Sequence, residues 1–277
     1  MGIEFTRSDF EKFRQFFYRK TGIFFPDSKK DFVEKRIIKR IEETGHSSFR
    51  SYFNFIRFDR SSDEIQNLIN LLTINETYFF REKYQFECLV ENVLNEIYEY
   101  KEPDEVIRIW SIPCSSGEEP YSIAIYLLEY WPLIDEVDVE IIASDIDTNV
   151  LDKAKKGIYN YRSVKNLPKH LLRKYFKKLS NDRYEIIDDL KEAIDFRQLN
   201  LFDPRQNKEY RYIDVIFCRN MLIYFDDESR LKAAQIFYDA MNPGGFIFLG
   251  HSESMSRICS LFKVRKFKQG IVYQKPF

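Results

Sequence analysis

Cysteine, histidine and long hydrophobic runs are scarce in this chain of 277 residues. The four cysteines and three histidines are scattered without a CxxC pair, so we expect neither a disulfide framework nor a bound metal. No apolar stretch reaches the roughly 20 residues of a membrane-spanning helix. The beginning, MGIEFTRSDF, has no basic and apolar secretion signal. We therefore expect a cytoplasmic protein that does not insert into a membrane.

The chain has almost equal numbers of positive and negative side chains, with 43 lysines and arginines and 44 aspartates and glutamates. Any basic surface that binds an acidic partner must therefore be local. A hydrophobic content of 44% and an aromatic content of 17% predict a well-packed core and give no case for disorder. The length leaves room for two domains.

The segment VIRIWSIPCSSGEEP, residues 106–120, predicts a buried strand, a turn of small residues and the start of a helix. This turn lacks the three glycines of a dinucleotide fingerprint and instead carries Glu118 and Glu119, which would repel phosphate. Asp145 ends the next predicted strand, 28 residues after Gly117, where an acid can bind ribose hydroxyls. A cofactor with a ribose and a cationic centre but no phosphate fits, and S-adenosylmethionine has these properties. The alternative is that both glutamates only favour the start of a helix.

The first part of the chain predicts helices, with Phe10, Phe13 and Phe17 at helical spacing and two further amphipathic runs up to about residue 72. We assign residues 1–72 to a helical domain and residues 73–277 to a second domain. After Asp145 an α/β alternation continues, interrupted at about residues 158–192 by an insertion with a helix near 169–176 and a hairpin turned at 180–182. A helix over 227–241, the turn NPGG, the strand FIFLGHSE and a hairpin around 269–270 follow.

One early helix, from Ser28 to a terminal Gly45, carries a local excess of positive charge. Residues 29–40 hold six basic and two acidic side chains. The apolar positions of this helix fall on one face and its basic positions on the other. We favour binding of an acidic partner over a merely solvated face. The candidate partner-binding residues are Lys35, Arg36, Lys39 and Arg40.

The order of these elements predicts an α/β fold of the class I S-adenosylmethionine-dependent methyltransferase type, a mostly parallel sheet that ends in an antiparallel hairpin. Several motifs also resemble the bacterial chemotaxis receptor methyltransferases of the CheR family: INETYFFRE, GEEPYS, ASDIDTNVLDKAKKGIY, IFCRNMLIYF and GHSES. The resemblance runs over nearly the whole chain. It implies methyl transfer from S-adenosylmethionine, with S-adenosylhomocysteine as product, to glutamates on the cytoplasmic helices of chemoreceptors. It also implies a monomer and no nucleic-acid partner.

The resemblance also assigns roles to individual residues. Arg81 and Tyr224 match catalytic positions, and Ile74 departs from the threonine of the family's TNxTxFFR stretch. Leu201 and Cys218 are equally consistent with plain core positions. The cofactor-binding positions implied are Asn75, Thr77, Arg81, Glu119, Asp145, Asn200, Leu201, Cys218 and Arg219.

Three other readings carry less weight. A dehydrogenase would use Asp145 but needs a glycine fingerprint, and an amino-directed nucleic-acid methyltransferase would carry an NPPY-type motif instead of RNMLIYF. A non-catalytic S-adenosylmethionine sensor would have lost Arg81 or Tyr224. Family members that dock on a C-terminal pentapeptide of the receptor have a glycine-rich turn in the insertion hairpin, whereas KKLSNDRYEIIDDL has no glycine. We therefore expect an enzyme that does not need this tether.

Overall fold

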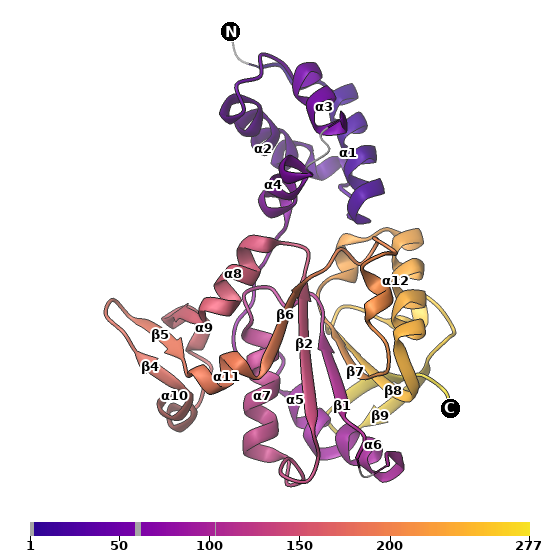
Figure 1. Cartoon of the computed structure of the whole chain (residues 1–277). Coiled ribbons are helices and arrows are strands. Elements are labelled where there is room, and N and C mark those ends of the chain that lie inside the picture. Colours follow the sequence, from indigo (N-terminus) through magenta and orange to yellow (C-terminus); the bar gives the residue numbers. More distant parts are fainter. Residues whose placement is uncertain (1–2, 59–61, 103) are drawn as a thin grey trace.

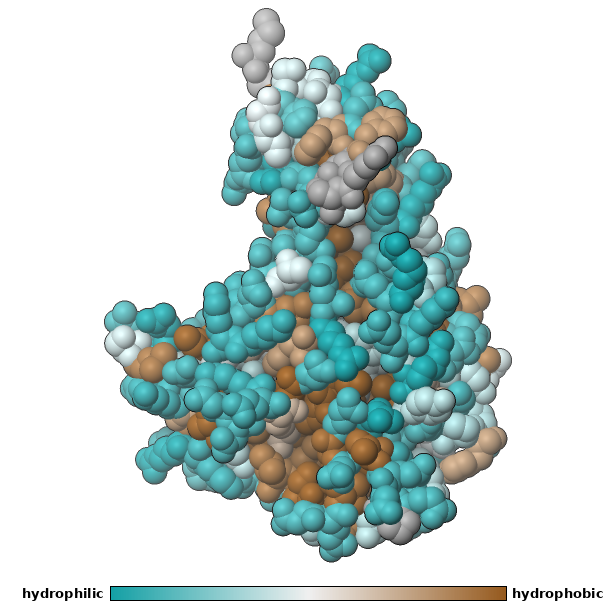
Figure 2. Space-filling view, in the orientation of Figure 1, coloured by the Kyte–Doolittle hydropathy of each residue, from teal (hydrophilic) through white to brown (hydrophobic). Residues whose placement is uncertain are grey.

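A small helical domain stands on one edge of a larger sheet domain, from which an insertion projects to the side (Figure 1). The computed structural model describes residues 3–58, 62–102 and 104–277. The last helix of the small domain is followed by the first segment of the sheet domain. The junction between the two domains lies close to the carboxyl ends of the first two strands. On the face shown in Figure 2, hydrophobic residues reach the surface at this junction and over the lower part of the sheet domain.

The helical domain consists of α1 (Arg7–Thr21), α2 (Lys30–Glu43), α3 (Phe49–Phe58) and α4 (Asp63–Leu72). Thr6 and Asp9 form a reciprocal capping box at the start of α1. The predicted aromatic positions Phe10, Phe13 and Phe17 are at most 1% exposed, which confirms them as core.

Helix α2 is shorter than the sequence suggested. Ser28 lies in a 3-10 turn, η1 (Asp27–Lys29), and caps no helix, while Gly45 follows the end of α2 with a φ of +71°. The predicted apolar face is correct, since Val33, Ile37 and Ile41 are fully buried.

The sheet has the strand order β6-β2-β1-β7-β8-β10-β9. The first five strands of this order run parallel, and β10 and β9 are antiparallel, so the predicted fold class is confirmed. The strands are β1 (Ile107–Ser111), β2 (Val139–Asp145), β6 (Ile194–Gln198), β7 (Ile213–Cys218), β8 (Met241–Leu249), β9 (Lys263–Phe267) and β10 (Gly270–Gln274). Helices around the sheet are α5 (Tyr84–Cys88), continued by a π-helical turn η2 (Leu89–Val93) and α6 (Leu94–Tyr100), then α7 (Glu118–Tyr130), α8 (Thr148–Lys156) and α12 (Asp227–Ala240).

The sequence NPGG was predicted as a turn, and this prediction is wrong. These residues belong to β8, whose pairing with β7 shifts register between Ile213 and Val215. A Cβ atom on Gly245 would lie 2.9 Å from the backbone oxygen of Asp214, so glycine permits the close approach of the two strands.

The insertion contains the predicted helix and hairpin. Its elements are β3 (Ile158–Asn160), α9 (Tyr161–Val164), α10 (Lys169–Tyr175), β4 (Phe176–Lys178), β5 (Arg183–Ile186) and α11 (Asp188–Glu192), and its strands form a separate antiparallel sheet. The turn from β4 to β5 reaches the left-handed region at Asn181 and Asp182, with φ values of 58° and 50°. Asparagine and aspartate tolerate this conformation, so the turn forms without glycine.

Two of the four basic residues predicted to bind a partner are held inside the helical domain. Arg40 forms an ion pair with the buried Glu64 at 2.6 Å, and Tyr52 donates a hydrogen bond to the same carboxylate at 2.6 Å. Burial raises the pKa of Glu64, but the bonds from Arg40 and Tyr52 outweigh this effect and lower the pKa overall. Arg36 donates to the backbone oxygen of Leu71 and lies 3.6 Å from the centre of the Phe32 ring.

We predict that Arg40→Ala destabilises the helical domain by roughly 2–3 kcal/mol, because the buried carboxylate of Glu64 loses the two hydrogen bonds and the positive charge of Arg40. Urea denaturation followed by circular dichroism measures this loss. Lys35→Ala serves as the control, since Lys35 is exposed on the same helix, and its effect should stay within about 0.5 kcal/mol. Equal stability of the two variants would contradict a structural role for Arg40.

Candidate active site

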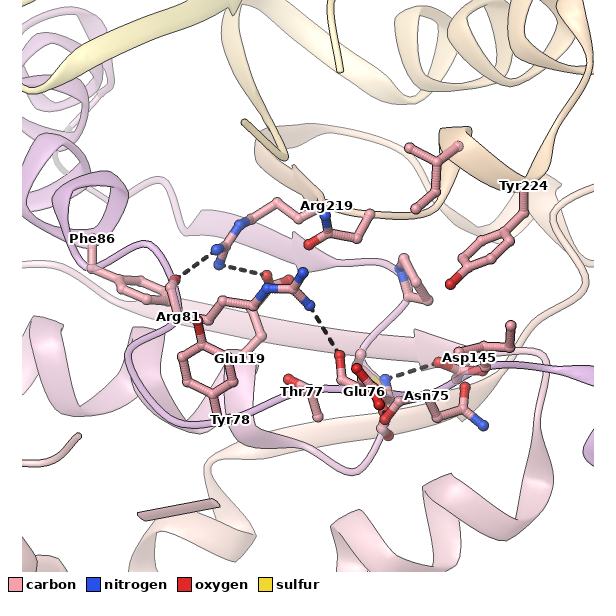
Figure 3. Close-up of a pocket in the computed structure, with 16 residues that line it drawn as sticks. Asn75, Glu76, Thr77, Tyr78, Arg81, Phe86, Glu119, Asp145, Arg219 and Tyr224 are labelled. Carbon is pink, nitrogen blue, oxygen red and sulfur yellow. Dashed lines mark hydrogen bonds and ion pairs between the residues drawn. The ribbon is translucent and has the colours of Figure 1, made fainter. Parts of the chain in front are cut away.

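The carboxyl ends of β1, β2 and β7 border two connected cavities. The first, which we call the central cavity, has a volume of about 150 Å³ and is shown in Figure 3. The second, the apolar cavity, has a volume of about 260 Å³ and lies between the sheet domain and residues 21–32 of the helical domain. Residues of both domains therefore line the apolar cavity, which lies directly beside the central cavity. The two cavities share Ile74, Asn75, Pro113, Asp145, Asn220, Ile223 and Tyr224.

Asp145 lies where the two cavities meet. The turn after β1 places the backbone N–H of Ser115 2.8 Å from one oxygen of Asp145, and the N–H of Asp147 donates to the other oxygen at 2.9 Å. The turn needs left-handed backbone at Ser115 and Gly117. Glycine adopts this conformation at low cost because it has no Cβ atom, whereas it costs roughly 1–2 kcal/mol at Ser115. Asp145 is 3% exposed, and this burial raises its pKa to about 6 although the backbone bonds oppose the shift.

A buried charge cluster closes the other end of the central cavity. Glu119 accepts hydrogen bonds from Ser111 at 2.8 Å and from Arg219 at 2.9 Å, and Arg219 donates to the backbone oxygen of Arg81 at 2.6 Å (Figure 3). Glu82 lies 3.4 Å from the same guanidinium. Burial raises the pKa of Glu119, and Arg219 opposes this shift.

The two glutamates of the turn have different roles. Glu118 lies outside the central cavity and accepts bonds from the hydroxyls of Ser163 and Ser116 at 2.6 and 2.7 Å. It therefore connects the turn to α9 of the insertion. Of the pair that the sequence offered to a cofactor, only Glu119 lines the central cavity.

The loop from Thr73 to Glu82 forms the rim of the central cavity. Asn75 donates to Asp147 at 2.7 Å, and Arg81 donates to the backbone oxygen of Glu76 at 2.9 Å. Thr77 also lines this cavity. Tyr224 lines both cavities, and its backbone oxygen accepts a bond from Phe24 of the helical domain at 3.0 Å. In Figure 3, Arg81 and Tyr224 come from opposite sides of the cavity.

The remaining predicted cofactor residues divide into two groups. Asn200 and Leu201 line the apolar cavity, and Asn200 also donates to the backbone oxygen of Lys20 at 2.7 Å. Cys218 is fully buried in the core, and neither cavity is lined by it among the described residues. We therefore interpret Cys218 as a core residue that ends β7 and positions Arg219.

The sequence analysis missed three residues of the site. Asn220 and Ile223 line both cavities, and Glu253 accepts bonds from the N–H groups of Asn220 at 2.8 Å and Ile223 at 3.3 Å. Glu253 thereby fixes the segment that carries Tyr224. Asn220 belongs to the motif FCRN and Glu253 to the motif GHSES, but the two motifs are far apart in the sequence, so the contact between them was not predicted.

These residues fit S-adenosylmethionine. The apolar cavity suits an adenine, Asp145 at the junction suits a ribose, and Glu119 suits an ammonium group because only part of its acceptor capacity is used. In addition, the buried Nε of Arg219 has no hydrogen-bond partner among the residues that the structure describes, although it belongs to the cluster beside the central cavity. Such an orphaned donor is consistent with a polar ligand next to Arg219.

Comparison with known proteins agrees with this geometry. Residues 75–271 match the model of the CheR methyltransferase SAM-binding domain, and residues 8–73 match that of the CheR methyltransferase all-alpha domain. This chain belongs to the CheR methyltransferase family. Its cofactor is therefore S-adenosylmethionine, and the dehydrogenase reading is set aside.

Curated members of the CheR family resemble this chain over most of their length. Chemotaxis protein methyltransferase 2 of Vibrio cholerae serotype O1 is 56% identical over 99% of this chain and 95% of its own. The chemotaxis protein methyltransferase of Borreliella burgdorferi is 35% identical over 92% and 91% of the two chains. The enzyme of the same name from Escherichia coli K12 is 35% identical over 92% and 87%.

We searched the described part of the chain for membrane-spanning helices and for metal-binding groups of side chains. Within residues 3–58, 62–102 and 104–277, none of the helices combines the length and apolar character needed to cross a bilayer. Across the same ranges, acidic, histidine and cysteine side chains form no group that would hold a metal ion.

We predict that the affinity for S-adenosylhomocysteine falls about tenfold from pH 7.5 to pH 5. The reason is that ribose hydroxyls donate to the ionised form of Asp145, whose pKa of about 6 in the free protein leaves it mostly protonated at pH 5. The raised pKa also means that ionisation of Asp145 lowers the stability of the free protein as the pH rises through 6, and ligand binding offsets this loss. Isothermal titration calorimetry measures the affinity.

Asp145→Asn is the matched control for this pH effect. The variant should bind more weakly at pH 7.5, by about 1–3 kcal/mol, and should lose most of the pH dependence. A wild-type affinity that stays constant between pH 5 and 7.5 would show that Asp145 does not bind the ribose in its ionised form.

Proposed function

We propose that the protein methylates glutamate side chains on the cytoplasmic helices of bacterial chemoreceptors, as a protein-glutamate O-methyltransferase in chemotactic adaptation. The observation that carries this proposal is that the central cavity contains Arg81 and Tyr224 but no histidine among its described lining residues. Its cysteine, Cys114, is 1% exposed, and burial raises the pKa of the thiol, so this group stays protonated at neutral pH and is not a base. The relatives from Vibrio cholerae and Escherichia coli are named chemotaxis protein methyltransferases, which supports the same pathway. A related receptor outside chemotaxis remains the second candidate substrate.

A glutamate acceptor explains why the site needs no general base. The unperturbed pKa of glutamate is about 4.3, so the nucleophile is already ionised at neutral pH. When bound, the cofactor supplies a methyl group on a positively charged sulfur, and transfer of this group to a carboxylate oxygen moves no proton. The residues of the site then have two tasks, to align the carboxylate and to keep water from it.

Arg81 and Tyr224 are placed for the first task. The Arg81 guanidinium is held by the backbone oxygen of Glu76 and lies at the rim, where it attracts a carboxylate. The Tyr224 hydroxyl has no hydrogen-bond partner among the described residues, and burial raises its pKa, so it stays a neutral donor. Both groups therefore suit the acceptor glutamate or the carboxylate of the cofactor.

We predict that Arg81→Ala lowers kcat/KM for receptor methylation roughly 100-fold and Tyr224→Phe about tenfold, since both changes disturb alignment of the reacting groups. Base-labile methyl groups on receptor glutamates, counted after incubation with labelled S-adenosylmethionine, provide the measurement. Circular dichroism should show unchanged folds. The exposed Arg173→Ala and Tyr161→Phe serve as controls, and wild-type turnover in the active-site variants would remove both residues from the site.

We further propose that residues 1–72 recognise the receptor through the basic face of α2. Arg36 and Arg40 have partners within the domain, so Lys35 and Lys39 carry the exposed charge of this face. Lys39 lies 3.6 Å from Glu43 in an exposed i,i+4 pair, which contributes little and leaves the lysine available to a partner. Arg36 and Arg40 then contribute mainly by holding the helix in place.

We predict that Lys35→Glu combined with Lys39→Glu lowers receptor methylation at low salt, with no change in cofactor affinity. The attraction is electrostatic, so wild-type activity on the receptor should also fall as salt shortens the screening length from about 10 Å at 0.1 M. Lys155→Glu with Lys156→Glu on α8 is a control of equal charge change. Normal methylation by the α2 variant, or an equal loss in the control, would refute a specific role of α2.

We also propose that the enzyme acts as a cytoplasmic monomer and without the pentapeptide tether. The side chains of Asn181 and Asp182 occupy the turn where tether-dependent relatives have glycines. Removal of the last five residues of a receptor should therefore leave its methylation by this enzyme unchanged, and a collapse of methylation would overturn tether independence alone.

A further inference from the structure

A polar groove adjoins the central cavity on the side of the insertion. It has a volume of about 490 Å³ and shares with the central cavity the loop residues from Asn75 to Tyr78 together with Arg81. The apolar cavity shares Asn75 with both, and it also meets the central cavity at Pro113, Asp145 and Tyr224, which do not line the polar groove. Because the adenosine is assigned to the apolar cavity, the polar groove offers a methyl acceptor a separate approach to the central cavity.

The wall of the groove opposite this loop is formed by α9 and the turn that follows it. Its residues there are Asn160, Arg162, Ser163, Lys165 and Asn166. Ser163 fixes this wall to the active site, because its hydroxyl donates to Glu118 at 2.6 Å and its backbone oxygen accepts from Phe79 at 3.0 Å. The insertion is therefore hydrogen-bonded to the turn that contains Glu118 and to the loop that contains Phe79. Other residues of both segments line the central cavity.

The groove carries an excess of available positive charge. Arg162 and Lys165 are exposed, and neither has an ion pair or a hydrogen bond from its side chain among the described residues. Arg81 adds a third cation at the inner end. Of the two acidic lining residues, Glu76 is exposed, whereas Glu118 is buried and satisfied by two hydroxyls. Two unpaired cations beside a carboxylate-binding site favour an acidic ligand.

We infer that the polar groove binds the acceptor segment of the substrate and that Arg162 and Lys165 recognise a second carboxylate, close to the glutamate that is methylated. This inference rests on the proposed function, because it assumes a protein glutamate as acceptor. On a helical acceptor, residues three or four apart lie on one face about 5–6 Å from each other. An acidic residue at such a spacing would face α9 while the acceptor glutamate reaches Arg81. The enzyme would thus prefer glutamates with an acidic neighbour.

The test compares two peptides that copy one methylated receptor helix. The first has glutamates four residues apart, and in the second the non-acceptor glutamate is replaced by glutamine. We expect Arg162→Ala combined with Lys165→Ala to raise KM for the first peptide about tenfold, the effect of losing two partly exposed ion pairs. The variant should change neither kcat nor the affinity for S-adenosylhomocysteine. For the second peptide, variant and wild type should have similar KM values.

Binding of the fluorescently labelled peptides in the presence of S-adenosylhomocysteine gives a readout that does not depend on turnover. Lys169→Ala with Lys177→Ala removes the same charge from exposed positions of the insertion outside the groove and should have no effect. An unchanged KM for the first peptide, or an equal rise for both peptides, would overturn the inference. If wild-type enzyme transfers methyl groups to neither peptide nor to intact receptor, the proposed function itself fails, which is a different outcome.

Discussion

The site depends on the interactions of the buried Arg219 guanidinium. Arg219 directly follows β7, and its guanidinium pairs with Glu119 in the first turn of α7, lies beside Glu82 and donates a hydrogen bond to the backbone oxygen of Arg81. Three segments far apart in the sequence are therefore joined around one charge whose side chain is only 2% exposed. Removal of a buried charge from such a cluster leaves its partners unpaired, which is costly. For this reason the rim loop, the cofactor turn and the last parallel strands form one unit.

The helical domain is part of the same site. Residues 21–32 form one side of the apolar cavity, and the backbone of Phe24 binds that of Tyr224. Tyr18 also donates to Asp226 at 3.1 Å, and Gln66 donates to the backbone of Ile146 at 2.9 Å. The helical domain, which we propose recognises the receptor, is thereby connected to the walls of the cavity that suits the cofactor.

Much of the fold follows from local patterns in the sequence. Helical spacing identified the core face of α2, and alternation of strands and helices identified a mostly parallel sheet that ends in an antiparallel hairpin. The failures have local causes as well. The turn NPGG lies within β8 because glycine allows β8 to approach β7 closely, and Ser28 fails to cap α2 because a 3-10 turn precedes that helix. Such details depend on neighbouring strands and loops, which propensity does not describe.

The pattern of elements in the sequence predicts the fold class and places Asp145 at the end of β2, and the family resemblance groups Arg81, Glu119 and Tyr224 in one site. Which charges are available to a ligand depends on the tertiary structure. Four basic residues on α2 look equivalent in the sequence, yet Arg40 is neutralised by Glu64 and Arg36 binds backbone oxygens. Glu118 and Glu119 are adjacent, yet one supports the insertion and the other lines the central cavity. The reason is physical, because the availability of a charge depends on partners that folding brings from distant parts of the chain.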